Sequence, residues 1–215
     1  PAHFGLSECM ALATNIAQNK VYQFNCDDGK LVDLEADIDD VFSPRHLDFH
    51  PTEKFAVVVS EEGNDIGPKI QSYSFNEQDL KFNTDAVSTA YLVPDGTGWK
   101  AIAQAEESPL YVANQKAFGA DVHFHPTILN VLYGSVRGYD RIVKYSFDPS
   151  NGKITREKDY PTCSKSANPD CKGYTSRTFE ITEDGSLTNP GYLLVVTNQD
   201  SYNVAVYKLN DDTGD

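Results

Sequence analysis

Arginine, histidine and acidic side chains recur at matching places in a repeated segment of this 215-residue sequence. Imidazole and carboxylate groups can take a proton from water, and guanidinium groups can bind an oxyanion or a phosphate. The candidates for catalysis are Arg45, His46, Glu61 and Asp121, and the candidates for ligand binding are His3, His123, Arg137, Arg177 and Gln199. The histidines do not follow metal-ligand spacings, so no metal is expected.

The segment that carries these residues is a turn, a short apolar strand, a small polar turn and a second apolar strand. The clearest copy starts at 49–54 and predicts strands at 55–61 and 69–75. Further copies predict strand pairs at 131–137 with 141–147, at 192–199 with 203–209, and, in shortened form, at 10–15 with 20–24. Strand pairs repeated at this spacing are typical of a β-propeller, in which each repeat is one blade.

The sequence therefore predicts an all-β propeller of four-stranded blades in a single domain. The expected blades are approximately 1–40, 41–83, 84–155 and 156–215. A blade takes roughly 40–50 residues, so only about four fit, and four-bladed rings are uncommon. Pro1 is not an initiator and the sequence stops in a turn-like run at 211–214, so we expect part of a larger ring. The segment 84–119 breaks the repeat, and 101–107 could form one or two helical turns.

Equivalent positions in a ring converge around its central channel, and this geometry would bring the candidate residues together. Arg45 and His46 precede one predicted strand, His123 precedes the next, and Arg177 precedes a third. Glu61, Arg137 and Gln199 lie at the far ends of those strands. Alternatives remain for each residue: Arg45 could bond carbonyls between blades, and Glu61 could pair with an arginine of a neighbouring blade. His50 and His125 belong to His-Pro turns and are expected to be structural.

Charge and hydropathy limit the partners. The net charge is −14 and the 18 Lys and Arg are scattered, which argues against nucleic acid because phosphates need clustered cations. No apolar run approaches the ~20 residues that span a bilayer. A small-molecule ligand is expected, with a protein partner as the alternative for a non-catalytic propeller.

The four cysteines suggest two disulfides. Cys163 and Cys171 bracket a polar loop, and simple hairpin pairing would place Cys9 opposite Cys26. The alternative is four free thiols, which are often small buried hydrophobes. Two bridges would favour an extracellular or secretory location, and their absence the cytoplasm.

Three motifs resemble the lactonase-type seven-bladed propellers, the 6-phosphogluconolactonase family that also relates to carboxymuconate cyclases. They are Ser-Pro-Arg-His-Leu-Asp-Phe-His-Pro at 43–51, Ala-Asp-Val-His-Phe-His-Pro at 120–126, and Ser-Arg-Thr-Phe-Glu-Ile at 176–181 with Thr-Asn-Gln-Asp-Ser at 197–201. The likeness is colinear and corresponds to roughly the last four of seven blades. Departures from the family pattern are Ser43, Val136 and Ser176, which stand where the family has Gly, Asn and Pro.

The resemblance implies hydrolysis of a sugar lactone, most simply 6-phosphogluconolactone to 6-phosphogluconate, without a cofactor. Glu61 or Asp121 would activate water, while Arg45 and His46 polarise the carbonyl. Arg137 and Arg177 would hold the phosphate, with His3, His123 and Gln199 as further ligand contacts. The alternatives are a non-catalytic binding or scaffold module and a carboxymuconate cyclase-like enzyme.

Overall fold

We describe a computed structural model of the chain, for residues 9–62, 67–94, 117–162, 175–185 and 191–215. The described residues form strands and turns without a helix, which confirms the all-β fold class. Among them, no helix has the length and apolar character needed to cross a membrane. The strands are β1 (Cys9–Asn15), β2 (Lys20–Asp27), β3 (Lys30–Asp33), β4 (Pro44–Phe49), β5 (Phe55–Ser60), β6 (Lys69–Asn76), β7 (Lys81–Phe82), β8 (Ser88–Tyr91), β9 (Phe118–Phe124), β10 (Val131–Arg137), β11 (Arg141–Asp148), β12 (Lys153–Pro161), β13 (Ser176–Glu183), β14 (Tyr192–Asn198) and β15 (Asn203–Lys208).

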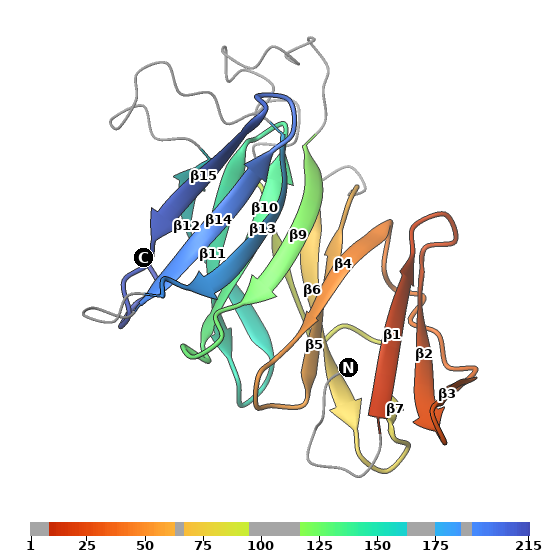
Figure 1. Cartoon of the computed structure of the whole chain (residues 1–215). Coiled ribbons are helices and arrows are strands. Elements are labelled where there is room, and N and C mark those ends of the chain that lie inside the picture. The colour runs from red at the N-terminus through yellow and green to blue at the C-terminus, as the bar shows by residue number, and fades with distance from the viewer. Residues whose placement is uncertain (1–8, 63–66, 95–116, 163–174, 186–190) are drawn as a thin grey trace.

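The strands form four antiparallel sheets that follow one another along the chain. Their strand orders are β1-β2-β3, β4-β5-β6-β7 with β8 also pairing β6, β9-β10-β11-β12, and β13-β14-β15. Figure 1 shows the sheets side by side, from the red first sheet on the right to the blue last sheet on the left. Meandering sheets that stack in chain order are the blades of a propeller.

The central strands of the second and third sheets are buried on both faces because each of these two blades packs between two others. β5 reads Phe-Ala-Val-Val-Val-Ser and β10 reads Val-Leu-Tyr-Gly-Ser-Val-Arg, both rich in residues that favour strands. The apolar core accordingly has three parts. One lies between the first and second sheets, one between the second and third, and one between the third and fourth.

The first strands of the second, third and fourth sheets lie at the sheet edges that meet the neighbouring blades. β4 contacts β9, and β9 in turn contacts β13. We call β4, β9 and β13 the inner strands. The three family motifs form these strands themselves, whereas the sequence analysis treated Arg45, His46, His123 and Arg177 as residues that precede a strand. That placement was wrong because these segments are polar and lack the apolar pattern by which the other strands were found.

Outer turns join each blade to the one before it. The turn at 148–152 packs on the second sheet, where the Ser72 hydroxyl donates to the Gly152 carbonyl at 2.6 Å. Phe82 and Gln23 link the second sheet to the first through two hydrogen bonds of 2.7 and 3.0 Å. In the same way, the Tyr133 hydroxyl donates to the Gly214 carbonyl.

Two expected blade boundaries fall inside sheets. β8 lies beyond residue 83 but pairs with β6, and β12 continues past residue 155 to Pro161. The outer strand of the second blade is split into β7 and β8, both paired with β6, and this break hid β8 from the repeat pattern. The turn expected at 101–107 lies outside the described residues.

The first hairpin has the predicted register, with Cys9 opposite Cys26. Cys26 is disulfide-bonded. The pairing of Cys9 with Cys26 stays a prediction, and Cys163 and Cys171 lie outside the described residues.

Candidate functional site

Polar side chains line the inner strands at alternate positions. His46 and Asp48 lie on β4, and Asp121 and His123 lie on β9. Residues two apart on a strand share a face, and neighbouring inner strands bring these faces together. The contacts between them join residues 75 or 76 positions apart, which is the separation of one repeat.

His46 and Asp121 form a hydrogen-bonded pair across two blades. Nδ1 of His46 lies 2.6 Å from Oδ1 of Asp121, and the side chains are 46% and 2% exposed, respectively. An ionised carboxylate only accepts hydrogen bonds, so Nδ1 carries the proton. In the neutral form of the ring with this tautomer, Nε2 carries the lone pair and could accept a proton from a bound water.

The surroundings of Asp121 keep it ionised despite its burial. Burial favours the neutral acid, but hydrogen bonds from His123, His46 and Thr178 hold the pKa of Asp121 well below its usual range. The backbone N–H of Val122 donates to Oδ1 at 3.0 Å. The N–H of Phe179 donates to Oδ2 at 3.3 Å.

His123 lies between two carboxylates. Its Nε2 is 3.4 Å from Oδ1 of Asp121, and its Nδ1 is 3.7 Å from Oδ2 of Asp48. Burial opposes the charge of His123, but the two carboxylates raise its pKa to about 10. His123 is therefore a cation at neutral pH, and the edge contact with Phe179, at a centroid distance of 5.0 Å, fixes its ring.

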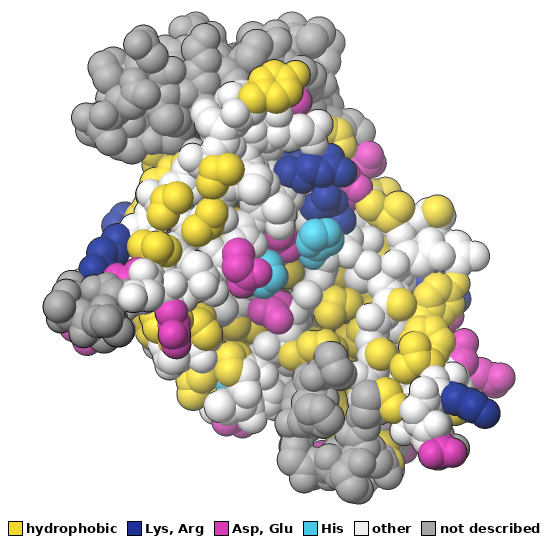
Figure 2. Space-filling view, in the orientation of Figure 1, with side chains coloured by type: hydrophobic (Ala, Val, Ile, Leu, Met, Phe, Trp, Pro, Cys, Tyr) yellow, Lys and Arg dark blue, Asp and Glu magenta, His cyan; other side chains and the backbone are white. Residues whose placement is uncertain are grey.

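Three arginines, Arg45, Arg137 and Arg177, lie beside the His46–Asp121 pair. Arg45 donates to the Ala120 carbonyl of the next inner strand, which is the inter-blade contact raised as its alternative role. Burial lowers the pKa of Arg45, and the charges of Arg137 and Arg177 lower it further. The carboxylates of Glu61 and Asp121 act in the opposite direction, so positive and negative charges alternate around Arg45. Figure 2 shows Lys and Arg side chains gathered beside histidine and acidic side chains on this face.

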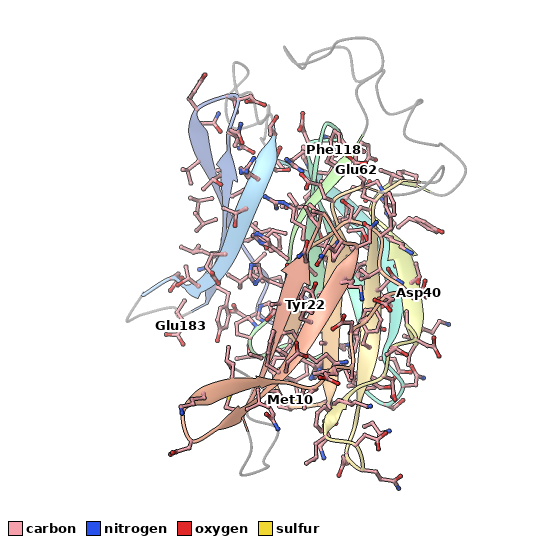
Figure 3. The ribbon with its side chains drawn as sticks, turned by 90° about the vertical axis from the view of Figure 1, so that its right-hand side faces the viewer. Met10, Tyr22, Asp40, Glu62, Phe118 and Glu183 are labelled. Atoms are coloured by element: carbon pink, nitrogen blue, oxygen red, sulfur yellow. The ribbon has the colours of Figure 1, made fainter. Side chains whose placement is uncertain are left out.

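Glu61 is paired with Arg137. Oε1 of Glu61 accepts from the Arg137 guanidinium, which also lies over the Phe118 ring at 5.4 Å. Figure 3 labels Phe118, which pairs with Arg137 in the third sheet, beside Glu62, the residue that follows Glu61. The structure thus contains the ion pair with a neighbouring-blade arginine that was the alternative for Glu61.

Gln199 contacts the third arginine, since Nη1 of Arg177 donates to Oε1 of Gln199 at 2.9 Å on the surface. Eight of the nine candidate residues lie on the inner strands or at the ends of the strands that follow them, in three neighbouring blades. His3 lies outside the described residues. Two neighbours, Asp48 and Thr178, were not among the candidates. Both stood in the quoted motifs, Asp48 in 43–51 and Thr178 in 176–181, but Thr178 has no charge that would single it out. Within the described part of the chain, no group of His, Cys, Asp and Glu side chains is arranged to hold a metal ion.

Comparisons with known proteins agree with the fold. Residues 7–215 match the model of a family described as lactonase, 7-bladed beta-propeller. A 6-phosphogluconolactonase from Formosa agariphila is 27% identical over 173 residues, which are 80% of this chain and 37% of that protein. The periplasmic gluconolactonase of Pseudomonas aeruginosa has a TM-score of 0.65 at 18% identity, over 96% of this chain and 48% of that one. A Lactobacillus plantarum protein has a TM-score of 0.65 at 20% identity, over 92% of this chain and 47% of that one. The chain thus spans less than half the length of each of these three proteins.

Proposed function

Because this chain belongs to the lactonase family of seven-bladed β-propellers, we propose that it contributes the active site of an enzyme that hydrolyses a sugar lactone. The observation that carries the proposal is the hydrogen bond of 2.6 Å between His46 and Asp121. In this bond Nδ1 of a half-exposed histidine is the donor, so the neutral ring offers Nε2 as an acceptor, and Arg45, which adjoins His46 in the sequence, senses the charges of Arg137 and Arg177.

In the proposed reaction, Nε2 of His46 takes a proton from water as the water oxygen attacks the lactone carbonyl carbon. Arg45 stabilises the oxyanion that forms on the carbonyl oxygen. The ring C–O bond then breaks, and the leaving alkoxide takes the proton from His46, which yields a hydroxy acid. Asp121 stabilises the transient imidazolium through Nδ1.

This assignment gives the base role to His46 in place of Glu61 or Asp121. Asp121 is 2% exposed and its two oxygens accept hydrogen bonds from protein groups, so a substrate water does not reach it. Glu61 is paired with Arg137. Both carboxylates are therefore better suited to holding other side chains than to activating water.

The proposed substrate is a lactone that carries an anionic group, most simply 6-phosphogluconolactone. Arg177 is exposed, and both Arg137 and Arg177 act on the charge of Arg45, so these arginines are the candidates for binding a phosphate. The Formosa agariphila relative is named for this substrate. The Pseudomonas aeruginosa protein is named for a lactone without phosphate, so the phosphate is the point to test.

A non-catalytic module that binds a small anion is the second candidate. The observation in its favour is that His46–Asp121 and Arg137–Glu61 both join neighbouring blades and stabilise the ring. Such a module would bind a sugar acid through the arginines without turning over a lactone.

The test is to follow acid release from a phosphorylated and an unphosphorylated sugar δ-lactone, with the natural protein and its His46→Gln and Arg177→Gln variants. We expect His46→Gln to lower kcat for both substrates by about a hundredfold or more. Arg177→Gln should raise KM for the phosphorylated substrate alone. Binding of the hydroxy acid without turnover by the natural protein would instead favour the non-catalytic module.

A further inference from the structure

The carboxylate of Asp121 is held by three blades. Oδ1 accepts from His46 on β4 and from the N–H of Val122 on its own strand. Oδ2 accepts from the Thr178 hydroxyl and from the N–H of Phe179, both on β13. Oδ1 also contacts Nε2 of His123 at 3.4 Å, a longer distance than the other donors to this oxygen. The two oxygens are therefore anchored to different neighbouring blades, Oδ1 to β4 and Oδ2 to β13.

This division of donors fixes the plane of the carboxylate. Rotation of the Asp121 side chain would break the bonds of Oδ2 to β13 as well as the bond of Oδ1 to His46. Without the Thr178 hydroxyl, Oδ2 keeps only the N–H of Phe179, whose distance of 3.3 Å is beyond the usual range for such bonds. His123, at 3.4 Å from Oδ1, would then compete with His46 for the carboxylate.

We propose that Thr178 is a positioning residue for His46: its hydroxyl fixes Asp121, and Asp121 in turn fixes the tautomer and direction of the His46 ring. The inference rests on the proposed function, in which Nε2 of His46 is the base. His46, Asp121 and Thr178 thus form one chain of hydrogen bonds across three successive inner strands.

The position of Thr178 allows a clean substitution. Thr178 is exposed, and its hydroxyl donates a hydrogen bond to Asp121. Valine has a similar shape and the same preference for strands, so Thr178→Val removes the hydroxyl and leaves β13 intact. Thr182 lies on the same strand and face, is also exposed, and provides the matched control Thr182→Val.

The test uses imidazole ¹⁵N chemical shifts in the natural protein, which report which ring nitrogen of His46 carries a proton. We expect His46 to be protonated at Nδ1 alone in the natural protein and in Thr182→Val. Thr178→Val should show a mixture of the two tautomers, and Thr178→Ser should restore the natural signal. In the hydrolysis assay, Thr178→Val should lower kcat by about tenfold with KM unchanged.

The outcomes separate this inference from the proposed function. Unchanged His46 shifts in folded Thr178→Val would overturn the positioning role, whether or not kcat falls. Altered shifts in a protein that hydrolyses no lactone would support the hydrogen-bond chain and overturn the proposed reaction. Equal effects of Thr178→Val and Thr182→Val would also contradict the inference, because Thr182 has no contact with Asp121.

Discussion

Nε2 of His50 donates a hydrogen bond of 2.7 Å to the carbonyl of Leu129, in the next blade. Nδ1 of the same ring accepts the N–H groups of Thr52 and Glu53 at 3.2 and 2.9 Å. One imidazole therefore closes its own turn and joins two blades. This arrangement confirms that the His-Pro turn has a structural role.

We expect His50→Phe to lower the free energy of unfolding by about 2 kcal/mol, since three hydrogen bonds of about 0.5–1.5 kcal/mol each are lost. Phenylalanine keeps the ring contacts with Phe124 and Phe147, at 4.9 and 5.2 Å, so the loss reports the hydrogen bonds. Urea unfolding measures it. Leu129→Ala retains the backbone carbonyl that accepts the hydrogen bond from His50, so it serves as the control. An equal loss of unfolding free energy in both variants would argue against the hydrogen bond between the blades.

The lowered pKa of His50 should also make the folding stability sensitive to acid. Burial lowers the pKa of His50 from 6.5, although the Leu129 carbonyl and the charges of Glu53 and Asp48 act in the opposite direction. The unfolded chain therefore takes up this proton first, and stability falls as the pH drops below 6.5 through the lower folded value. In urea unfolding at pH 7.5 and 5, the natural protein should lose more stability than His50→Phe does.

For His123 we expect the opposite dependence, a contribution to folding stability that is lost at alkaline pH. Its folded pKa of about 10 exceeds the ordinary value of 6.5, so its stabilising charge is complete below pH 6.5 and is lost as the pH rises through about 10. We expect His123→Gln to be less stable by about 2 kcal/mol at pH 6, the usual contribution of a hydrogen bond to a charged group. The difference from the natural protein should shrink by pH 10. A difference that stays constant would mean that His123 is not charged.

Glu61→Gln separates the two acid-base assignments. Because Glu61 pairs with Arg137, the substitution should weaken an inter-blade contact by about 1 kcal/mol and leave the base in place. We expect kcat/KM to fall by less than about tenfold, against a hundredfold or more for His46→Gln. The reverse order in the lactone hydrolysis assay would return the base role to Glu61.

Two glycines provide a matched test of the outer turns. Gly29 and Gly152 both have φ of +75°, but a Cβ on Gly29 meets nothing within 4 Å, whereas one on Gly152 would lie 2.6 Å from the Phe55 ring. Gly29→Ala should lower stability by about 1 kcal/mol through backbone strain alone. Gly152→Ala should lower it by about 2 kcal/mol more, because it forces the blades apart. Equal thermal unfolding of the two variants would mean that the turn does not pack on the second sheet.

The strands with apolar sequences were predictable because burial between two blades leaves a local signal. Val57 and Val58 of β5 are both fully buried, and neighbouring apolar residues of this kind are visible in the sequence alone. β4 has no such signal, since it reads Pro-Arg-His-Leu-Asp-Phe. Its membership of the sheet depends on tertiary pairing with β5.

The candidate residues were chosen from repeated positions in the sequence, but their hydrogen-bond and ion-pair partners were not predictable in this way. The pairing of His46 with Asp121 depends on how one inner strand lies against the next, which no local pattern records. The same holds for Thr178, an uncharged residue that became relevant only through Asp121. The roles that we propose for Asp121 and Glu61 differ from the sequence-based expectation for this reason, since burial and an ion pair are properties of the assembled blades.

The separation of His46 and Asp121 by one repeat has a consequence for how such rings can be recombined. A blade looks like a self-contained module that could be exchanged between homologous proteins. Here each module carries one half of a hydrogen-bonded His–Asp pair, and its neighbour carries the other half. A chimaera that replaces the second blade alone would therefore need a compatible residue opposite Asp121, so the exchangeable unit for the site is a run of adjacent blades.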